Sequence, residues 1–206
     1  MQNLVSLDVR LLHALNGLAG RSPVLDALMT ACAQYAPFAF AALLAGLWLT
    51  WRREWQQPAL LAGASALLAL ALGQVVGMLV PRLRPYEAPG IGPPPVRLLL
   101  PHSPDTSFPS DHATLAFAIT VALWATDRRL GALALLVSLW LCVARVYIGA
   151  HYPSDVIGGA VLGAAVAGGV LWLSRRTVLR GWLDHLFDVL HRLHLSAGRT
   201  SMSSAD

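Results

Sequence analysis

Three short polar segments interrupt an otherwise apolar chain, and each carries side chains suited to phosphate chemistry. They are residues 82–85, 107–112 and 145–155. Ionisable side chains at membrane depth are costly to bury and usually serve a function. Because these segments combine arginines, which bind phosphoryl oxygens, with histidines, which transfer protons or attack phosphorus, they predict a phosphate-handling site.

The segment 145–155 has the most specific spacing. Arg145 ends one apolar run, His151 lies in the following turn and Asp155 opens the next run. A carboxylate near a histidine fixes the imidazole tautomer and stabilises its positive form, which leaves the other ring nitrogen free to attack phosphorus. The alternative is structural: Asp155 caps a helix and Arg145 extends to lipid headgroups.

The segment 107–112 is expected to open a helix. Ser110 is a good N-cap, and the free N–H groups and dipole of a helix N-terminus favour a bound phosphate. His112, one position into the helix, could donate a proton to a leaving oxygen. Alternatively, Ser110 and Asp111 only cap a membrane helix, with His112 as an interfacial residue.

The segment 82–85 contains Arg82 and Arg84 directly after an apolar run. Basic residues that flank a membrane helix are ordinary on the cytoplasmic side and less expected on the outer side. A position on the outer side of the membrane would therefore favour a ligand-binding role for Arg82 and Arg84.

The composition indicates a polytopic membrane protein. The chain has 206 residues, of which 56% are hydrophobic and 13% charged, against about 25% charged residues in soluble domains. All 15 basic residues are arginines in short clusters between apolar runs. The net charge of +4 is therefore not the footprint of a nucleic-acid-binding protein, and no nucleic-acid partner is expected.

The apolar runs predict an all-α membrane helix bundle in a single domain, residues 1–195, followed by a disordered tail, residues 196–206. Interfacial amphipathic helices are expected at both ends, over residues 4–18 and after Arg176. Gly159 and Gly163, four residues apart, predict close helix packing. About five transmembrane helices are expected, over residues 35–51, 59–80, 112–126, 130–148 and 156–173.

The arginine clusters orient the chain. Residues 52–53, 128–129 and 175–180 fall on one side, which the positive-inside rule makes cytoplasmic. All three polar segments then lie together on the outer side. Only 15 residues separate Asp111 from Asp127, or ~22 Å of helix against a hydrocarbon core of ~30 Å. The charged helix ends are therefore expected at the depth of lipid headgroups.

Jointly, the three segments resemble the type 2 phosphatidic acid phosphatase superfamily. That family has Lys-x6-Arg-Pro, Pro-Ser-Gly-His and Arg-x5-His-x3-Asp motifs in this order. The third motif is complete here, whereas Asp111 replaces the glycine of the second and Gly77 stands at the lysine position of the first. Both departures resemble the bacitracin-resistance branch, the undecaprenyl pyrophosphate phosphatases.

The resemblance implies a role for each matching residue. His151 would be the nucleophile, Asp155 its orienting partner and His112 the general acid. The phosphate would be held by Arg84, Arg145 and the segment Ser110, Asp111 and His112. Arg82 could supply the charge of the missing lysine, and Asp111 would repel phosphate unless it is paired, turned away or holds a cation. The family chemistry needs neither metal nor cofactor, and none is expected.

The expected function is removal of the terminal phosphate from a lipid diphosphate, by resemblance undecaprenyl diphosphate, at the outer face of a bacterial inner membrane. A broader phosphatase acting on phosphatidate or phosphatidylglycerophosphate is the alternative enzyme. An anion transporter or channel is the alternative from another class, but Thr114, Thr120 and Ser138 are almost the only polar residues in the last three spans. The sequence leaves open the lipid specificity, the oligomeric state and the path of the proline-rich loop, residues 86–106.

Overall fold

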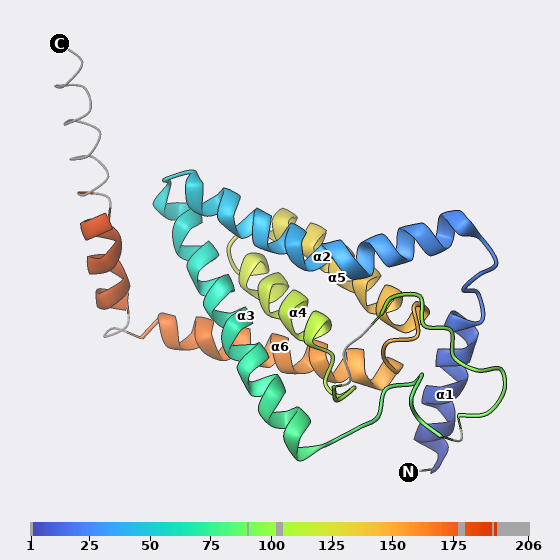
Figure 1. Ribbon diagram of the computed structural model, residues 1–206. Helices are drawn as coiled ribbons and strands as arrows, with labels where there is room; N and C mark the ends of the chain where they lie inside the picture. The colour runs from blue at the N-terminus through green and yellow to red at the C-terminus, as the bar shows by residue number, and fades with distance from the viewer. Residues whose placement is uncertain (1, 90, 102–104, 177–179, 191, 193–206) are drawn as a thin grey trace.

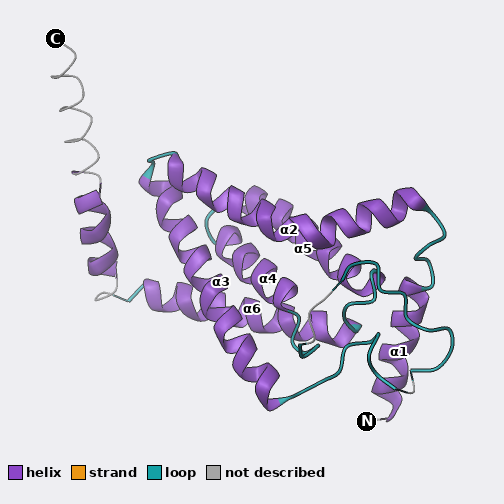
Figure 2. Cartoon of the chain, viewed as in Figure 1, coloured by secondary structure: helices purple, strands orange, loops and turns teal. Residues whose placement is uncertain are grey.

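The computed structural model describes residues 2–89, 91–101, 105–176, 180–190 and 192, and every regular element in these ranges is a helix (Figures 1 and 2). The predicted all-α class is therefore confirmed. A further helical segment covers residues 180–190. The helices are α1 (Gln2–Asn16), α2 (Pro23–Leu49), α3 (Arg53–Leu79), α4 (Asp111–Trp124), α5 (Arg128–Tyr147) and α6 (Pro153–Ser174).

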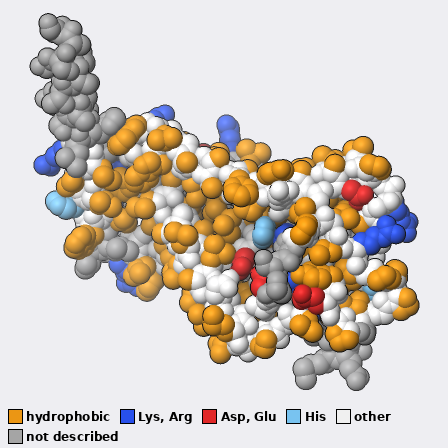
Figure 3. All heavy atoms as spheres, viewed as in Figure 1, with side chains coloured by type: hydrophobic (Ala, Val, Ile, Leu, Met, Phe, Trp, Pro, Cys, Tyr) orange, Lys and Arg blue, Asp and Glu red, His pale blue; other side chains and the backbone are white. Residues whose placement is uncertain are grey.

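Four helices, α2, α3, α5 and α6, are long and apolar enough to cross a membrane. The protein is therefore a multi-pass membrane protein. The predicted third span is the shorter α4, whose 14 residues reach ~21 Å. Hydrophobic side chains cover much of the visible surface of the bundle, as a lipid-facing exterior requires (Figure 3).

The first two spans begin earlier than predicted. Helix α2 starts at Pro23 rather than at residue 35, and α3 starts at Arg53 rather than at residue 59. In α2, Asp26 lies in the first turn, where its carboxylate accepts hydrogen bonds from Gly20 N at 3.0 Å and from the Tyr147 hydroxyl at 2.6 Å. Because this carboxylate accepts both hydrogen bonds near the helix N-terminus, it is compatible with a helix that begins before it.

Helix α4 lies at the centre of the bundle and packs against α6, α3 and α5. Its contact with α6 is close because two glycines of α6 face it. A Cβ at Gly159 would lie 2.5 Å from Ser110 O, and one at Gly163 would lie 2.1 Å from Thr114 O. The close packing predicted from this glycine pair is confirmed, and it brings the N-termini of α4 and α6 together, where Ser110 N donates to Asp155 O at 3.1 Å.

Helix α1 turns two of its polar residues toward the bundle, together with Leu12, and two of its leucines outward. Asp8 and Asn16 are buried, whereas Leu7 and Leu11 are almost half exposed. The Asn16 amide donates to Tyr147 O and to Arg97 O, both at 2.8 Å. These bonds fasten α1 to the end of α5 and to the proline-rich loop.

The polar segments meet at one end of the bundle. Helices α3 and α5 end there, whereas α4 and α6 begin there, and the arginine-bearing α2–α3 and α4–α5 turns lie at the opposite end (Figure 1). Near that opposite end Arg53 binds Asp184 and Asp188 of the helical segment 180–190, which buries Phe187. The predicted disordered tail, residues 196–206, lies outside the described residues.

The packing of α4 on α6 gives a test with two matched substitutions. Gly163→Ala should lower the melting temperature in detergent, because its Cβ would overlap the backbone of α4 and overpacking costs about 1–3 kcal/mol. Gly168→Ala, in the same helix but with nothing within 4 Å of the added Cβ, should leave it unchanged or raise it slightly. Equal shifts for the two variants would show that the helices do not pack this closely.

Candidate active site

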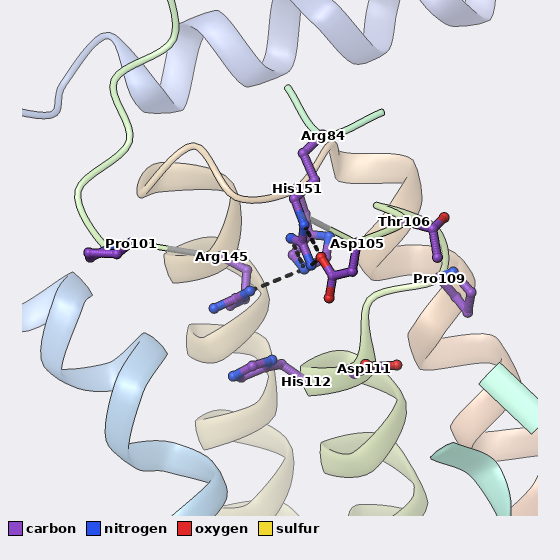
Figure 4. Close-up of a pocket in the computed structure, with 9 residues that line it drawn as sticks. All are labelled: Arg84, Pro101, Asp105, Thr106, Pro109, Asp111, His112, Arg145 and His151. Atoms are coloured by element: carbon purple, nitrogen blue, oxygen red, sulfur yellow. Dashed lines mark hydrogen bonds and ion pairs between the residues drawn. The ribbon is translucent and has the colours of Figure 1, made fainter. Parts of the chain in front are cut away.

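A pocket of about 270 Å³ opens where the three polar segments converge (Figure 4). Each segment reaches it from a different element: the loop after α3, the start of α4, and the end of α5 with the turn that follows. The lining residues are Arg84, Pro101, Asp105, Thr106, Pro109, Asp111, His112, Arg145 and His151. Both histidines singled out from the sequence point into this pocket.

The hydrogen bonds of His151 determine its tautomer. Its Nε2 lies 3.2 Å from Arg84 NH1 and 3.2 Å from Arg145 NH2, while its Nδ1 lies 2.9 Å from the carbonyl oxygen of Ser107. Guanidinium groups only donate hydrogen bonds and carbonyls only accept them. Nε2 must therefore carry the lone pair and Nδ1 the proton. The neutral ring, 2% exposed, presents an unprotonated nitrogen to two cationic groups.

Asp155 is close to His151 but does not bond to it directly. The distance from His151 Nδ1 to Asp155 Oδ2 is 3.8 Å. Instead the fully buried carboxylate accepts hydrogen bonds from Ser107 Oγ at 2.6 Å, from Tyr152 N at 2.9 Å and from Arg82 NH1 at 2.7 Å. Ser107 thus contacts both members of the pair, through its carbonyl and its hydroxyl, and a positive charge on the ring would face the carboxylate.

Arg84 and Arg145 are buried at the floor of the pocket, with 4% and 1% of their surface exposed. Arg84 NH1 also donates to Ala150 O at 2.9 Å, and its Nε donates to Asp105 Oδ1 at 2.6 Å. The cavity thus holds two buried guanidinium groups beside one imidazole. Such a cavity is suited to an anion with several oxygens.

The start of α4 contributes the other face of the site. His112 points into the pocket, and in Figure 4 Arg145 lies between it and His151. Ser110 is fully buried, and its hydroxyl has no hydrogen-bond partner among the described residues. Asp111 lines the pocket but also accepts hydrogen bonds from Gln74 of α3, at 3.1 and 3.2 Å. The carboxylate whose repulsion the sequence analysis foresaw is therefore paired.

Arg82 lies apart from this pocket, in contrast to its predicted role as a phosphate ligand. Its guanidinium donates to Asp155 and to Ser154 Oγ, donates to Asp8 at 2.6 Å, and stacks on the Tyr152 ring at 3.9 Å. Asp8 in turn accepts from Ser154 N at 2.9 Å. Burial acts to lower the pKa of Arg82, but the hydrogen bond to Asp8 and the charge of Asp155 outweigh it and raise that pKa.

The position of the family lysine is closed by packing. A Cβ at Gly77 would lie 2.6 Å from the Thr106 methyl carbon and 3.2 Å from the carbonyl oxygen of Phe108. The loop that enters the pocket therefore rests directly on α3 at this glycine. A lysine here would have to displace the loop.

The predicted site did not include three residues that complete it: Ser107, Asp8 and Asp105, the last of which was considered as a substrate contact and set aside. Ser107 was noted only as the first residue of its segment, although a hydroxyl two residues before Pro109 could have been weighed as a ligand of Asp155. Asp105 lies in the proline-rich loop, where spacing gives no guide. Asp8 is 74 residues from Arg82 in sequence, so only the fold brings them together.

No group of three or more His, Cys, Asp or Glu side chains that could hold a metal ion occurs in the ranges that the structure covers. The two carboxylates that line the pocket, Asp105 and Asp111, each have a protein partner, Arg84 and Gln74. The groups on hand to receive an anion are therefore guanidinium and imidazole nitrogens.

Residues 58–178 match the model of the PAP2 superfamily. This range contains all three polar segments and the pocket. The chain belongs to the PAP2 superfamily. Its relatives include the undecaprenyl-diphosphatase BcrC of Bacillus subtilis, 31% identical over 86% of this chain and 89% of that protein.

Two further PAP2 comparisons agree with the fold and the length. A Bacillus licheniformis protein named bacitracin transport permease protein BcrC is 30% identical over 81% of this chain and 80% of its own. The crystal structure of Aquifex aeolicus LpxE superposes with a TM-score of 0.67 at 26% identity, covering 80% of this chain and 94% of that one. The resemblance stated from the motifs is thus confirmed at the level of the superfamily.

The position of Arg82 predicts that it supports Asp155 and does not bind the substrate phosphate. Arg82→Gln should lower kcat by on the order of tenfold to a hundredfold, because Asp155 loses a partner and the site shifts. The affinity for orthovanadate should stay within about twofold of the original, because Arg82 lies outside the anion pocket. Asp8→Asn should act in the same direction, and kcat and vanadate binding are the two measurements.

The control is Arg21→Gln, which removes an exposed arginine near the same end of the bundle and should change neither quantity. A large loss of vanadate affinity in Arg82→Gln, with kcat preserved, would instead assign Arg82 to the phosphate, as the sequence analysis suggested.

Proposed function

We propose that this protein is a membrane phosphatase that removes the terminal phosphate of undecaprenyl diphosphate through a phosphohistidine intermediate. The observation that carries the proposal is the environment of His151. Its Nε2 lone pair accepts hydrogen bonds from Arg84 and Arg145 at the pocket, and its protonated Nδ1 is held by Ser107. A ring nitrogen in this state needs no proton removal before it attacks, and the two guanidinium groups would transfer their hydrogen bonds to the phosphoryl oxygens as the substrate binds.

Substrate binding is assigned to the positive groups of the pocket. Arg84 and Arg145 would hold the oxygens of the terminal phosphoryl group through charge-assisted hydrogen bonds. The buried hydroxyl of Ser110 and the backbone N–H groups at the start of α4 would complete the cradle. These contacts place phosphorus in front of Nε2 and stabilise the charge that develops on its oxygens.

In the first step the Nε2 lone pair attacks phosphorus, an N–P bond forms and the bond to the bridging oxygen breaks. Protonated His112 gives its proton to that oxygen, so undecaprenyl phosphate leaves. The His151 ring becomes positive, because it now carries both the phosphoryl group and the Nδ1 proton. The buried carboxylate of Asp155, 3.8 Å from Nδ1, stabilises this charge.

In the second step a water molecule attacks the phosphoryl group from the side that the leaving lipid has vacated. His112, now neutral, takes a proton from that water, and the N–P bond breaks. Nε2 recovers its lone pair and orthophosphate is released. The two halves of the reaction use the same residues, and His112 ends in the protonated state in which it began.

We place this site at the outer face of a bacterial inner membrane. The support is the position of the arginine clusters, 52–53, 128–129 and 175–176, at the end of the bundle opposite the pocket. Short loops rich in arginine stay cytoplasmic. The short helix α4 sets its charged N-terminus at the depth where a lipid diphosphate headgroup lies.

A broader lipid phosphate phosphatase is the second candidate enzyme. It is favoured by the pocket itself, because the described lining residues recognise phosphoryl oxygens and none of them is committed to a polyprenyl chain. Phosphatidate and phosphatidylglycerophosphate present the same terminal phosphoryl group. The relative from Bacillus licheniformis is named a transport permease, yet the charged side chains of helices α2 to α6 lie in the first or last turns of those helices.

The covalent mechanism predicts the behaviour of His151→Ala in detergent. Phosphate release should fall by at least roughly a thousandfold, because the nucleophile is gone. Binding of orthovanadate should persist, because both arginines remain. The measurement is phosphate release from undecaprenyl diphosphate together with vanadate binding.

The matched control is His185→Ala, which removes an exposed histidine of the segment 180–190 far from the pocket and should retain full turnover. If His151→Ala kept turning over substrate, the phosphohistidine route would be excluded.

Substrate choice is tested by comparing kcat/KM for undecaprenyl diphosphate and phosphatidate under identical detergent conditions. The proposal expects the diphosphate to be favoured by at least roughly tenfold, because its second phosphate adds charge next to the buried guanidinium groups. Equal or reversed values would assign the broader phosphatase activity instead.

A further inference from the structure

The carboxylate of Asp105 occupies the edge of the Arg84 guanidinium group that a bound phosphoryl group would use. Asp105 Oδ1 lies 2.6 Å from Arg84 Nε and 2.6 Å from Arg84 NH2. The Arg84 side chain is 5% exposed, whereas half of the Asp105 side chain, 51%, is exposed. In Figure 4 the Asp105 side chain points toward Arg84 and His151 from the loop segment above α4.

The hydrogen bonds of Arg84 show why this contact matters. Its NH1 group is directed to Ala150 O and to His151 Nε2. The remaining edge, formed by Nε and NH2, is the fork that guanidinium groups use to bind two oxygens of one anion. That edge is taken by Asp105. An anionic substrate can use the fork only by taking the place of this carboxylate.

The other carboxylates near the site are held differently. Asp155 is fully buried and accepts bonds from Ser107, Tyr152 and Arg82. Asp111 is bound through both of its oxygens to Gln74. Asp105 instead approaches Arg84 through Oδ1 and already has half of its surface in contact with solvent. It therefore loses little solvation when it rotates away, whereas Arg84 is fixed by its bonds to the turn after α5.

We propose that Asp105 occupies the Nε and NH2 edge of Arg84 until an anionic substrate displaces it. Weakly binding anions are thereby excluded, and the pocket selects among phosphates. The terminal phosphoryl group of the lipid diphosphate would displace Asp105 from Arg84. After turnover, Asp105 would return to the fork and compete with the orthophosphate product. This inference rests on the proposed function, in which Arg84 binds the phosphoryl group.

The exchange has a consequence for product release. Two buried guanidinium groups alone would retain orthophosphate, because charge-assisted hydrogen bonds in a buried site are strong. A carboxylate tethered on the neighbouring loop is always at hand to compete for one of them. The lipid diphosphate has a second phosphate with which to overcome this competition, whereas orthophosphate does not. Asp105 should therefore weaken inhibition by the product more than it weakens binding of the substrate.

The first arm of the test measures binding without turnover. Inorganic phosphate is titrated by calorimetry into the full-length His151→Ala protein in detergent, with and without Asp105→Asn. Removing the competing negative charge should tighten phosphate binding by roughly tenfold. Glu87→Gln is the matched control, because it removes an exposed carboxylate of the same loop that does not line the pocket, and it should leave the affinity within about twofold.

The second arm measures inhibition of turnover. In the protein with His151 intact, Asp105→Asn should lower the inhibition constant for phosphate by roughly tenfold and lower KM for undecaprenyl diphosphate by less. Asp105→Ala serves as a second neutral variant, and melting temperatures establish that both variants are folded.

Weaker phosphate binding in both neutral variants would overturn the proposal, because it would mean that Asp105 orients Arg84 for the ligand. An unchanged phosphate affinity would overturn it as well. The calorimetric arm requires no substrate. If the wild-type protein failed to hydrolyse undecaprenyl diphosphate but showed the predicted dependence on Asp105, the proposed function would fail and the exchange would stand.

Discussion

The guanidinium groups of Arg84 and Arg145 both donate to one ring nitrogen of His151, and the residues around this contact are arranged to maintain it. Arg84 and Arg145 are almost completely buried, and a buried positive charge without an acceptor is costly. The lone pair of His151 Nε2 accepts from both, which is possible only while that nitrogen is unprotonated. The ring is held in this form by Ser107 O on its other side. The anion-binding groups thereby also maintain the proposed nucleophile in its reactive state.

This contact requires elements distant in sequence to meet within hydrogen-bond distance. Because the two glycines of α6 have no Cβ, the backbone of α4 can lie where a Cβ would otherwise clash with it. The two helix N-termini are then joined by the bond from Ser110 N to Asp155 O. The pocket then lies where α4 begins, beside the end of α5 and the turn that follows it. The loop that supplies Ser107 lies across Gly77, where a larger residue would hold it away.

The sequence predicted the convergence and several of its members, since each polar segment lies at the end of an apolar run. His151, His112, Arg84 and Arg145 could be placed on one pocket because the runs alternate direction across a membrane. The supporting residues could not be found in this way. Asp8 lies in the segment predicted as an interfacial helix, and its carboxylate is buried against Arg82. An ion pair of this kind cannot be predicted from the periodicity of the sequence, because it depends on which face of α1 packs against the bundle.

The starts of the spans were misplaced for a related physical reason. The first span was predicted to begin at residue 35. In the folded chain the helix begins at Pro23, and Asp26 in its first turn accepts hydrogen bonds from Gly20 and Tyr147. The cost of a polar residue in an apolar helix depends on its partners, and those partners lie in α5 and in the preceding turn. Composition alone could not reveal them.

The attachment of α1 has a practical consequence for handling the protein. The Asp8 carboxylate binds Arg82, which in turn binds Asp155, the partner of the proposed nucleophile. Asn16 fastens the other end of the helix to the loop over the site. Additions or deletions at the amino terminus would therefore pull on the catalytic centre. Purification handles and fluorescent fusions belong at the carboxyl end, beyond the segment 180–190, whose contacts with Arg53 lie away from the pocket.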